Sequence, residues 1–341
     1  MIEGFSIGHH DARGDGWLTG TTVVLARDGA TAGVDVRGGG PGTRETDLLR
    51  PTAMVHDIHA VVLTGGSAYG LAAADGAMAG LEERGIGFPV PAPPADPPAA
   101  VVPIVPAAVI FDLGRGGVSA HRPDASFGSR ALDAAFRADL GSGELPPVGS
   151  VGAGTGAVCG GLRGGFGYAE RIAGPFRIGA ALVLNASGPA VDERTGRPWA
   201  DTLGSLPAPT ADQRAAIAEA LHWVPTLPLN TTIATVLTDA TLDRDQATKV
   251  AQVAHDGLAR AVRPVHRMFD GDTMFCLASG RVPVDPATGP ATDPRRLFDL
   301  LLTAAADVVE EACLVALLAA TTAGLWPAYA DLVPEVRRPA G

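Results

Sequence analysis

The sequence is poor in cysteine and lysine. Its 341 residues include three cysteines, Cys159, Cys276 and Cys313, which are scattered rather than arranged as a framework or a metal-ligand cluster. The chain has one lysine, Lys249. We therefore expect no disulfide framework, no metal and no cofactor.

Long apolar runs and basic stretches are also missing. The longest apolar run, residues 312–326, is shorter than a membrane span and follows Glu310 and Glu311. The first residues contain no basic segment followed by an apolar one, so we expect no signal peptide. The net charge is −11, the pI is about 5.1, and no basic stripe is visible, which argues against nucleic acid as a partner. These features predict a cytoplasmic protein without a membrane partner.

What the chain does contain is a high proportion of small and apolar residues. Hydrophobic residues make up 46% and charged residues 18%, which predicts a packed globular core rather than disorder. The 44 glycines and 28 prolines indicate many tight turns and close backbone contacts. The length suits one large domain or two ordinary ones.

Apolar periodicity and turn residues predict an alternation of strands and helices. The predicted strands are residues 21–26, 31–36, 60–64, 103–113, 178–185, 231–238 and 274–277, and the predicted helices are residues 72–83, 129–140, 211–222, 243–260 and 294–322. Residues 27–30 separate the first two strands and indicate a hairpin. Asp243 with Gln246 fits an N-terminal capping pattern. The proline-dense residues 89–98 predict an exposed loop, and Pro225 and Pro228 predict a turn.

Three glycine-rich segments resemble known motifs but lack a defining element of each. Residues 37–46 lack the Gly-Lys-Ser/Thr that closes a phosphate-binding P-loop. Ser67 follows a strand at a glycine turn, but the Gly-x-Ser-x-Gly spacing of a nucleophile elbow is absent. Residues 152–157 fit Gly-x-Gly-x-x-Ala, yet the following segment is too rich in glycine to begin a dinucleotide-binding helix.

The segment Asn230-Thr231-Thr232 stands at the start of a predicted strand and has a counterpart later in the chain. Asp270 and Asp272 lie two residues apart, just before another apolar strand, so both can point the same way. A turn asparagine followed by two strand-forming residues would explain the first segment without any function. The alternative is a threonine that becomes the first residue of a new chain, whose own α-amine then activates its hydroxyl. An α-amine with a pKa of about 7.7–8.0 can act as a base near neutral pH.

These segments resemble those of the P1-family peptidases, which include D-/L-aminopeptidases, β-peptidyl aminopeptidases and nylon-oligomer hydrolases. The resemblance runs from Gly8 to Thr322 through five separate blocks, including residues 37–47, 60–71, 152–157 and 178–188. Members of this family are made as one chain and cut themselves before a Ser or Thr. The resemblance implies one hydrolase domain, residues 1–341, with an α/β four-layer sandwich (α-β-β-α). It also implies cleavage between Asn230 and Thr231 and a homo-oligomer, often a tetramer.

The resemblance further implies roles for single residues. Asn185 would supply an amide N–H to the oxyanion of an acyl intermediate, with Thr231 as the nucleophile. Asp270 and Asp272 would orient that nucleophile and its amine. We place Tyr69, Phe111 and Arg163 as possible pocket residues. Some relatives have a tyrosine where this chain has Phe111, and relatives have a lysine near the position of Arg163, whose guanidinium cannot serve as a base.

Three functions remain open from the sequence. The family implies hydrolysis of a small peptide or amide, such as an aminoacyl amide, a β-peptide or a nylon-type ω-amide oligomer. Ornithine acetyltransferases share a related fold and the same cleavage before threonine, so acyl transfer to an amine is an alternative. A catalytically silent binding protein is the third, suggested by Phe111 and by the missing lysine.

Overall fold

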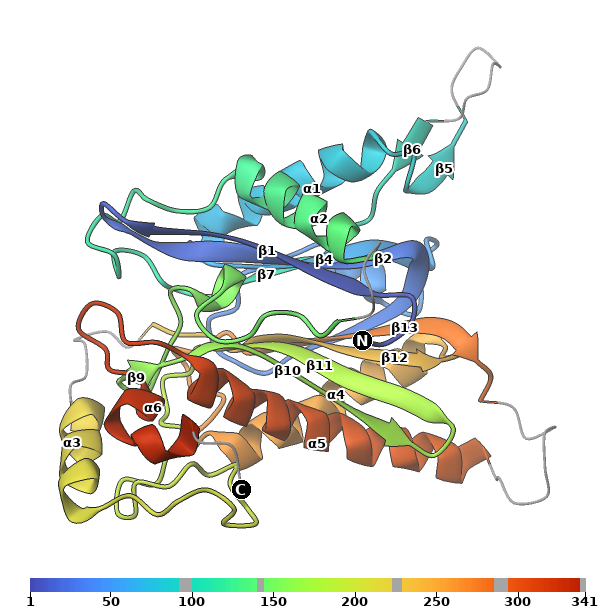
Figure 1. Cartoon of the computed structure of the whole chain (residues 1–341). Coiled ribbons are helices and arrows are strands. Elements are labelled where there is room, and N and C mark those ends of the chain that lie inside the picture. The colour runs from blue at the N-terminus through green and yellow to red at the C-terminus, as the bar shows by residue number, and fades with distance from the viewer. Residues whose placement is uncertain (92–99, 140–143, 223–228, 285–293, 338–341) are drawn as a thin grey trace.

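The computed structural model describes residues 1–91, 100–139, 144–222, 229–284 and 294–337, and it shows four stacked layers (Figure 1). Helices cover both outer sides of a pair of β-layers. The predicted turn at Pro225 and Pro228 and most of the proline-dense loop at 89–98 lie outside the described residues. The α-β-β-α order agrees with the fold predicted from the sequence.

The first β-layer is built around the N-terminal half of strand β2. It contains β1 (Ser6–Gly14), β2 (Trp17–Val36), β4 (Asp57–Thr64), β7 (Ala107–Val109) and β3 (Thr43–Arg44). β1 and β4 pair with β2 antiparallel on its two sides, and β7 runs parallel to β4. Apolar residues fill consecutive positions of β4 because both faces of this layer are covered.

The second β-layer carries the segments that the sequence marked as candidates for function. It contains β10 (Gly165–Ala173), β11 (Phe176–Leu184), β12 (Ile233–Ala240) and β13 (Thr273–Val282), in that order. β12 and β13 are parallel, and β11 is antiparallel to β12. On its other side β13 pairs with the C-terminal half of β2, residues 31–36.

β2 therefore belongs to both layers, and the predicted hairpin between residues 21–26 and 31–36 is wrong. The two segments form one strand of 20 residues, whose hairpin partner is β1 across the turn at Asp15 and Gly16. Between Leu25 and Ala30 the pairing with β4 shifts register, and Gly29 has a φ of 83°. The turn residues Asp28 and Gly29 thus produce an irregularity that bends the strand from one layer into the other, rather than reversing it.

Most of the predicted helices begin and end within a residue of the predicted positions. α1 (Ala73–Glu82) and α2 (Ala125–Asp139) cover the first layer, whereas α4 (Arg244–Ala261) and α5 (Pro294–Ala319) cover the second. α3 (Ala211–His222) and the short α6 (Tyr329–Leu332) lie together beyond one end of α5 (Figure 1). Asp243 caps α4 as predicted, accepting the N–H of Gln246 while the Gln246 side chain accepts the N–H of Asp243.

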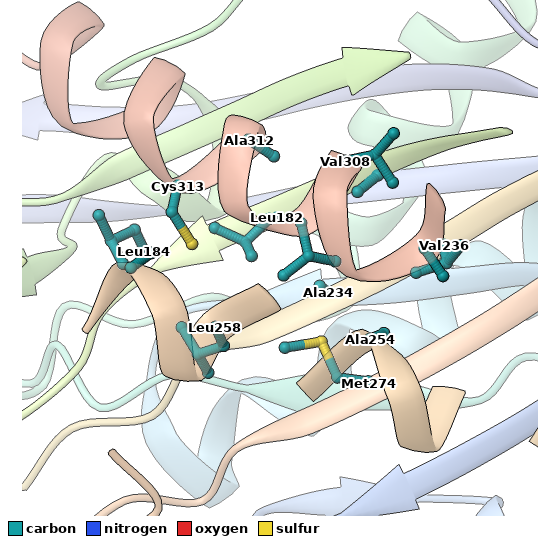
Figure 2. Packing of buried hydrophobic residues seen from close by; sticks show 14 of the residues in the cluster. Leu182, Leu184, Ala234, Val236, Ala254, Leu258, Met274, Val308, Ala312 and Cys313 are labelled. Atoms are coloured by element: carbon teal, nitrogen blue, oxygen red, sulfur yellow. The ribbon is translucent and has the colours of Figure 1, made fainter. Parts of the chain in front are cut away.

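Three hydrophobic cores separate the four layers, which follows from the alternation of side chains along each strand. Along β12, Ile233 and Leu237 face the core between the two β-layers, whereas Ala234 and Val236 face α4 and α5. Figure 2 shows the outer core, formed by Leu182, Leu184, Ala234, Val236, Ala254, Leu258, Met274, Val308, Ala312 and Cys313. Each fully buried large aliphatic side chain contributes about 1.5–3 kcal/mol, so these cores hold the second layer firmly.

Small residues allow the helices to approach the strands closely. A Cβ on Gly167 of β10 would lie 1.9 Å from the carbonyl oxygen of Ala312 in α5, so only glycine fits there. No helix in the described part of the chain is both long enough and apolar enough to cross a membrane.

Candidate active site

The candidate site lies where three strands of the second layer meet at one edge. In the parallel pair, Ile233 at the start of β12 stands beside Thr273 at the start of β13. In the antiparallel pair, Val183 near the end of β11 stands beside Ile233. The residues just before β12 and β13 and just after β11 therefore come together, although they are far apart in the sequence.

Thr231 lies at the centre of this edge and is only 5% exposed. Its backbone N–H donates to the carbonyl oxygen of Asn185 at 2.6 Å. Its hydroxyl donates to the carbonyl oxygen of Asn230 and accepts the backbone N–H of Gly271 at 3.1 Å. The hydroxyl is thus in contact with the carbonyl group of the peptide bond that the sequence marked for cleavage.

Asn185 follows β11 and is completely buried. Its Oδ1 accepts hydrogen bonds from Arg115 Nη1 at 2.5 Å and from the N–H of Val158 at 2.9 Å. Its Nδ2 has no hydrogen-bond partner among the described residues. With Oδ1 occupied by two donors, the orientation of the amide is fixed, and a buried N–H remains free to donate to a developing negative charge.

Arg115 connects Asn185 to Asn230, the residue that precedes the candidate cleavage bond. Its Nη2 donates to Asn230 Oδ1 at 2.9 Å, and its Nη1 also donates to the carbonyl oxygen of Gly156 at 2.7 Å. Asn230 Nδ2 in turn donates to the carbonyl oxygen of Ala186 at 2.6 Å. Burial lowers the pKa of Arg115 to about 10, so the guanidinium remains charged near neutral pH.

Asp270 is held by the segment that follows Asn185. Its two carboxylate oxygens accept the N–H of Ser187 at 2.9 Å and the Ser187 hydroxyl at 2.6 Å. The N–H of Arg267 donates to it at 3.3 Å. Burial raises the pKa of Asp270, and the nearby charge of Asp272 raises it further, against the lowering effect of the Ser187 hydrogen bonds.

Asp272 is fully buried on the other side of Gly271. Its Oδ1 accepts the N–H of Thr232 at 2.8 Å, and its Oδ2 lies 2.8 Å from Nδ1 of His266. His266 has a φ of 55°, an uncommon value for a residue other than glycine. Its ring packs edge-on against His255, with 4.9 Å between ring centroids. With the 230–231 bond intact, Asp272 thus contacts Thr232, the residue after Thr231, and Asp270 contacts Ser187, while Gly271 contacts the Thr231 hydroxyl.

The structure brings together Asn185, Asn230, Thr231, Asp270 and Asp272. Of the three candidate pocket residues, Arg163 lines a pocket that also includes Arg115, whereas Tyr69 and Phe111 do not line that pocket. Tyr69 is 58% exposed, and the guanidinium of Arg122 lies 3.7 Å from its ring centroid. Phe111 is half-buried after β7. Among the described residues, no side-chain hydrogen bond joins either one to Thr231. Arg163 is buried in the wall of a pocket beside Arg115.

Arg115, Ser187 and His266 belong to the site and were missed from the sequence. Ser187 stands two residues after Asn185, and His266 stands six residues before Asp272, so proximity to a candidate is a weak signal for both. Arg115 lies between glycines, Gly114 and Gly116, which marks a turn and gives no indication of its partners. Its contacts with Asn185 and Asn230 join segments 70 and 115 residues away.

The fold is shared with a solved hydrolase structure. The structure of L-aminopeptidase D-Ala-esterase/amidase from Ochrobactrum anthropi, described as a variant of the Ntn-hydrolase fold, matches with a TM-score of 0.68. The match covers 98% of this chain and 93% of that one at 18% identity. The four layers and their order therefore define an Ntn-type hydrolase fold.

The comparison of sequences defines the family. The model of peptidase family S58 matches residues 2–325. An uncharacterised aminopeptidase of Mycobacterium tuberculosis is 43% identical over 98% of this chain and 97% of its own length. A 6-aminohexanoate-oligomer endohydrolase of Kocuria sp. is 31% identical over 82% of this chain and 74% of its own. The chain belongs to peptidase family S58 and is an amidohydrolase or aminopeptidase of the Ntn type, as the resemblance predicted.

Proposed function

We propose that the chain hydrolyses small peptides or amides through Thr231, after cutting itself between Asn230 and Thr231 into residues 1–230 and 231–341 of one hydrolase domain. One observation carries the proposal. The Thr231 hydroxyl touches the carbonyl group of Asn230, and the Thr231 N–H donates to the backbone of the buried Asn185, whose Nδ2 has no partner among the described residues. A nucleophile, an acyl group and an oxyanion donor thus lie at one strand edge.

Self-cleavage begins when the Thr231 hydroxyl attacks the carbonyl carbon of Asn230. The C–N bond breaks, the acyl group moves from nitrogen to oxygen, and an ester forms. Water then hydrolyses the ester, giving a carboxylate on Asn230 and a free α-amine on Thr231. The hydrogen bonds of the Asn230 side chain to Arg115 and Ala186 hold this acyl group in place during the attack.

Substrate hydrolysis repeats this chemistry on an external amide. The α-amine of Thr231 takes the proton of the hydroxyl, and the oxygen attacks the substrate carbonyl. Asn185 Nδ2 donates to the resulting oxyanion, the amine returns the proton to the leaving nitrogen, and water hydrolyses the acyl-enzyme. Such a preorganised donor contributes about 2.7–4 kcal/mol to lowering the barrier. Asp270 and Asp272 keep Thr232 and the loop at Gly271 in register with the nucleophile.

The experiment that tests this proposal compares the purified protein with a Thr231→Ala variant. We expect intact-mass measurement to find a break at the 230–231 bond in the parent and none in the variant. Only the parent should hydrolyse a panel of aminoacyl p-nitroanilides, β-peptides and aminohexanoate oligomers. A full-length parent chain without a break, or an active Thr231→Ala variant, would contradict the proposal.

The same preparation tests the remaining expectations. We propose that the enzyme is a cytoplasmic homo-oligomer, with a tetramer as the expected size. Light scattering after gel filtration measures the mass of the assembly, and fractionation of the producing cells measures its location. Transfer of an acetyl group from N-acetyl-ornithine to glutamate, at a rate above hydrolysis, would favour acyl transfer instead.

A further inference from the structure

A pocket of about 350 Å³ lies beside the candidate active site and is bordered by three arginines, Arg13, Arg115 and Arg163. Trp17 and Thr322 also line it. Arg115 is shared between the pocket and the active site, because the same guanidinium donates to Asn185 and Asn230. Only the Arg115 side chain would therefore separate a molecule in this pocket from Asn230, whose acyl group Thr231 attacks.

Arg163 is the least satisfied polar side chain in this wall. It is completely buried, and its Nη2 donates to the carbonyl oxygen of Thr155. Its Nε and Nη1 have no hydrogen-bond partner among the described residues. A buried guanidinium with two unused donors is costly unless an acceptor completes it, and a planar pair of N–H groups matches the two oxygens of a carboxylate.

The charges around the pocket favour an anion. Burial lowers the pKa of Arg163 to about 10, and the positive charges of Arg115 and Arg13 add to this effect. Arg13 is paired with Asp11, and Asp15 is an exposed negative charge on the lining. Asp112 is buried close to Arg115, and burial raises its pKa, which disfavours its charged form.

We propose that this pocket binds the free carboxylate of a short substrate, with Arg163 as the main contact, so that the enzyme prefers substrates that end in a carboxylate. This inference rests on the proposed function, because it assigns a substrate class to that active site. The carboxylate accepts hydrogen bonds from Arg163 Nε and Nη1 while Arg115 spans the distance to Asn185. The pocket thereby limits the substrate to one with its charged end a short way from the scissile amide.

The first test measures hydrolysis of matched substrate pairs that share one scissile bond and end in either a carboxylate or a carboxamide. We expect kcat/KM to favour the acid by roughly tenfold to a hundredfold, the range for hydrogen bonds to a charged group. Arg163→Gln should lower kcat/KM for the acid far more than for the carboxamide, so that the preference is lost. A parent enzyme that hydrolyses both members equally overturns the pocket assignment and leaves the proposed function standing.

Two variants at exposed lining residues keep the test independent of how well Arg163→Gln folds. Arg13→Gln should lower the preference for the acid, whereas Asp15→Asn should raise it by removing a competing negative charge. Asn tolerates the φ of 49° at this position, so the backbone is preserved. Arg281→Gln serves as the control, since Arg281 pairs with Glu3 and Asp28 and none of these three residues lines the pocket. Equal shifts in all variants, or no shift in any, would contradict the proposal.

The second test measures binding without hydrolysis. Calorimetric titration of the purified protein with N-acetylglycine, N-acetylglycinamide and inorganic phosphate should give at least tenfold tighter binding of the acid than of the amide, and Arg163→Gln should remove this difference. If the parent binds the acid in this way but hydrolyses nothing, the pocket assignment stands and the proposed function fails. If phosphate binds best and hydrolysis ignores the carboxylate, the pocket holds an adventitious ion only and the proposal is overturned.

Discussion

Asn185 combines a fixed orientation with a donor that finds no partner in the described part of the chain, a state that costs stability in the resting protein. Leaving a buried polar group without a partner costs about 1–3 kcal/mol. Its Oδ1, by contrast, is satisfied twice, by Arg115 and Val158. An oxyanion donor needs this arrangement, with a satisfied Oδ1 and a free Nδ2. The free energy lost by leaving Nδ2 unpaired is recovered when Nδ2 donates to the negative charge of the oxyanion.

Replacing Asn185 by Ala removes this donor. We expect kcat to fall by about 10²- to 10³-fold, the effect of deleting one oxyanion donor. Steady-state kinetics measure the loss, and circular dichroism of the same preparation checks that the fold is retained. Turnover equal to the parent would reduce Asn185 to a residue that only terminates β11.

Asp270 sets an expected pH dependence. Since burial and Asp272 raise its pKa, its carboxyl stays protonated to a higher pH than an ordinary aspartate. If the ionised form is needed, kcat/KM is full above this raised pKa and falls as pH drops through it. The acidic limb of the pH profile, to which protonation of the Thr231 α-amine also contributes because that amine is the proposed base, should therefore lie above the usual aspartate range.

Substituting each aspartate in turn tests whether its carboxyl group shapes the acidic limb of the pH profile. Asp270→Asn and Asp272→Asn should each depress hydrolysis strongly and displace the acidic limb, because neither amide can ionise. Profiles of kcat/KM against pH for the parent and both variants provide the measurement. Two variants that retain the rate and limb of the parent would make the aspartates structural turn residues.

The residues that could be predicted for the site share a local signature. Asn185, Thr231, Asp270 and Asp272 all stand at the end or start of an apolar strand, where a plain turn residue would look the same, and the family resemblance is what implied their roles. Arg115 and Ser187 have no such signature, because their importance lies in contacts made across the fold. Arg115 becomes meaningful only when the end of β11 and the start of β12 are placed next to each other.

At the scale of single elements, the helices followed from the sequence more closely than the strands. The apolar stripe and the Asp243–Gln246 capping pair located α4 to within a residue. β2 was divided in two because Asp28 and Gly29 are typical turn residues, and whether they reverse a strand or bend it depends on its partners. Those partners, β4 and β13, come from later in the sequence.

The cap of α4 provides a test at this scale. Asp243→Ala removes the hydrogen bond from the Gln246 N–H to the Asp243 carboxylate, whereas the backbone N–H of residue 243 can still donate to the Gln246 side chain. The substitution should lower the free energy of unfolding by about 1 kcal/mol. Asp245→Ala in the first turn of the same helix is the matched control, and it should change the stability by less. Urea denaturation compares the two variants, and equal losses would mean that the capping box adds nothing.

At the scale of the whole molecule, the proposed cut separates elements that are interleaved. β12 and β13, which would belong to the second piece, lie between β11 and β2 of the first. Backbone hydrogen bonds join β12 to β11 on one side and β13 to β2 on the other. Side chains of α4 and α5, which would also belong to the second piece, complete the outer core. Cleavage therefore breaks one covalent bond without breaking a layer.

The two pieces should consequently stay together after cleavage but unfold as two molecules. We expect them to co-purify, and we expect the thermal midpoint of the cleaved protein to rise with protein concentration. The uncut Thr231→Ala variant should unfold at a midpoint that is less sensitive to concentration. Calorimetry over a hundredfold range of concentration makes the comparison, and two identical dependences would contradict it.

Because β2 runs through both β-layers, the number of residues in its bend decides which core each side chain of the strand enters. Val24 before the bend and Ala32 after it both face the core between the β-layers, whereas Val23 faces α1 and α2 and Gly33 faces α4. Inserting or deleting one residue between them would exchange odd and even positions in one half of the strand only. In that half each core would receive the side chains that belong to the other core, including a side chain at the place of Gly33 against α4, while the other half stayed correct. Length changes at residues 26–30 are therefore expected to be tolerated in steps of two.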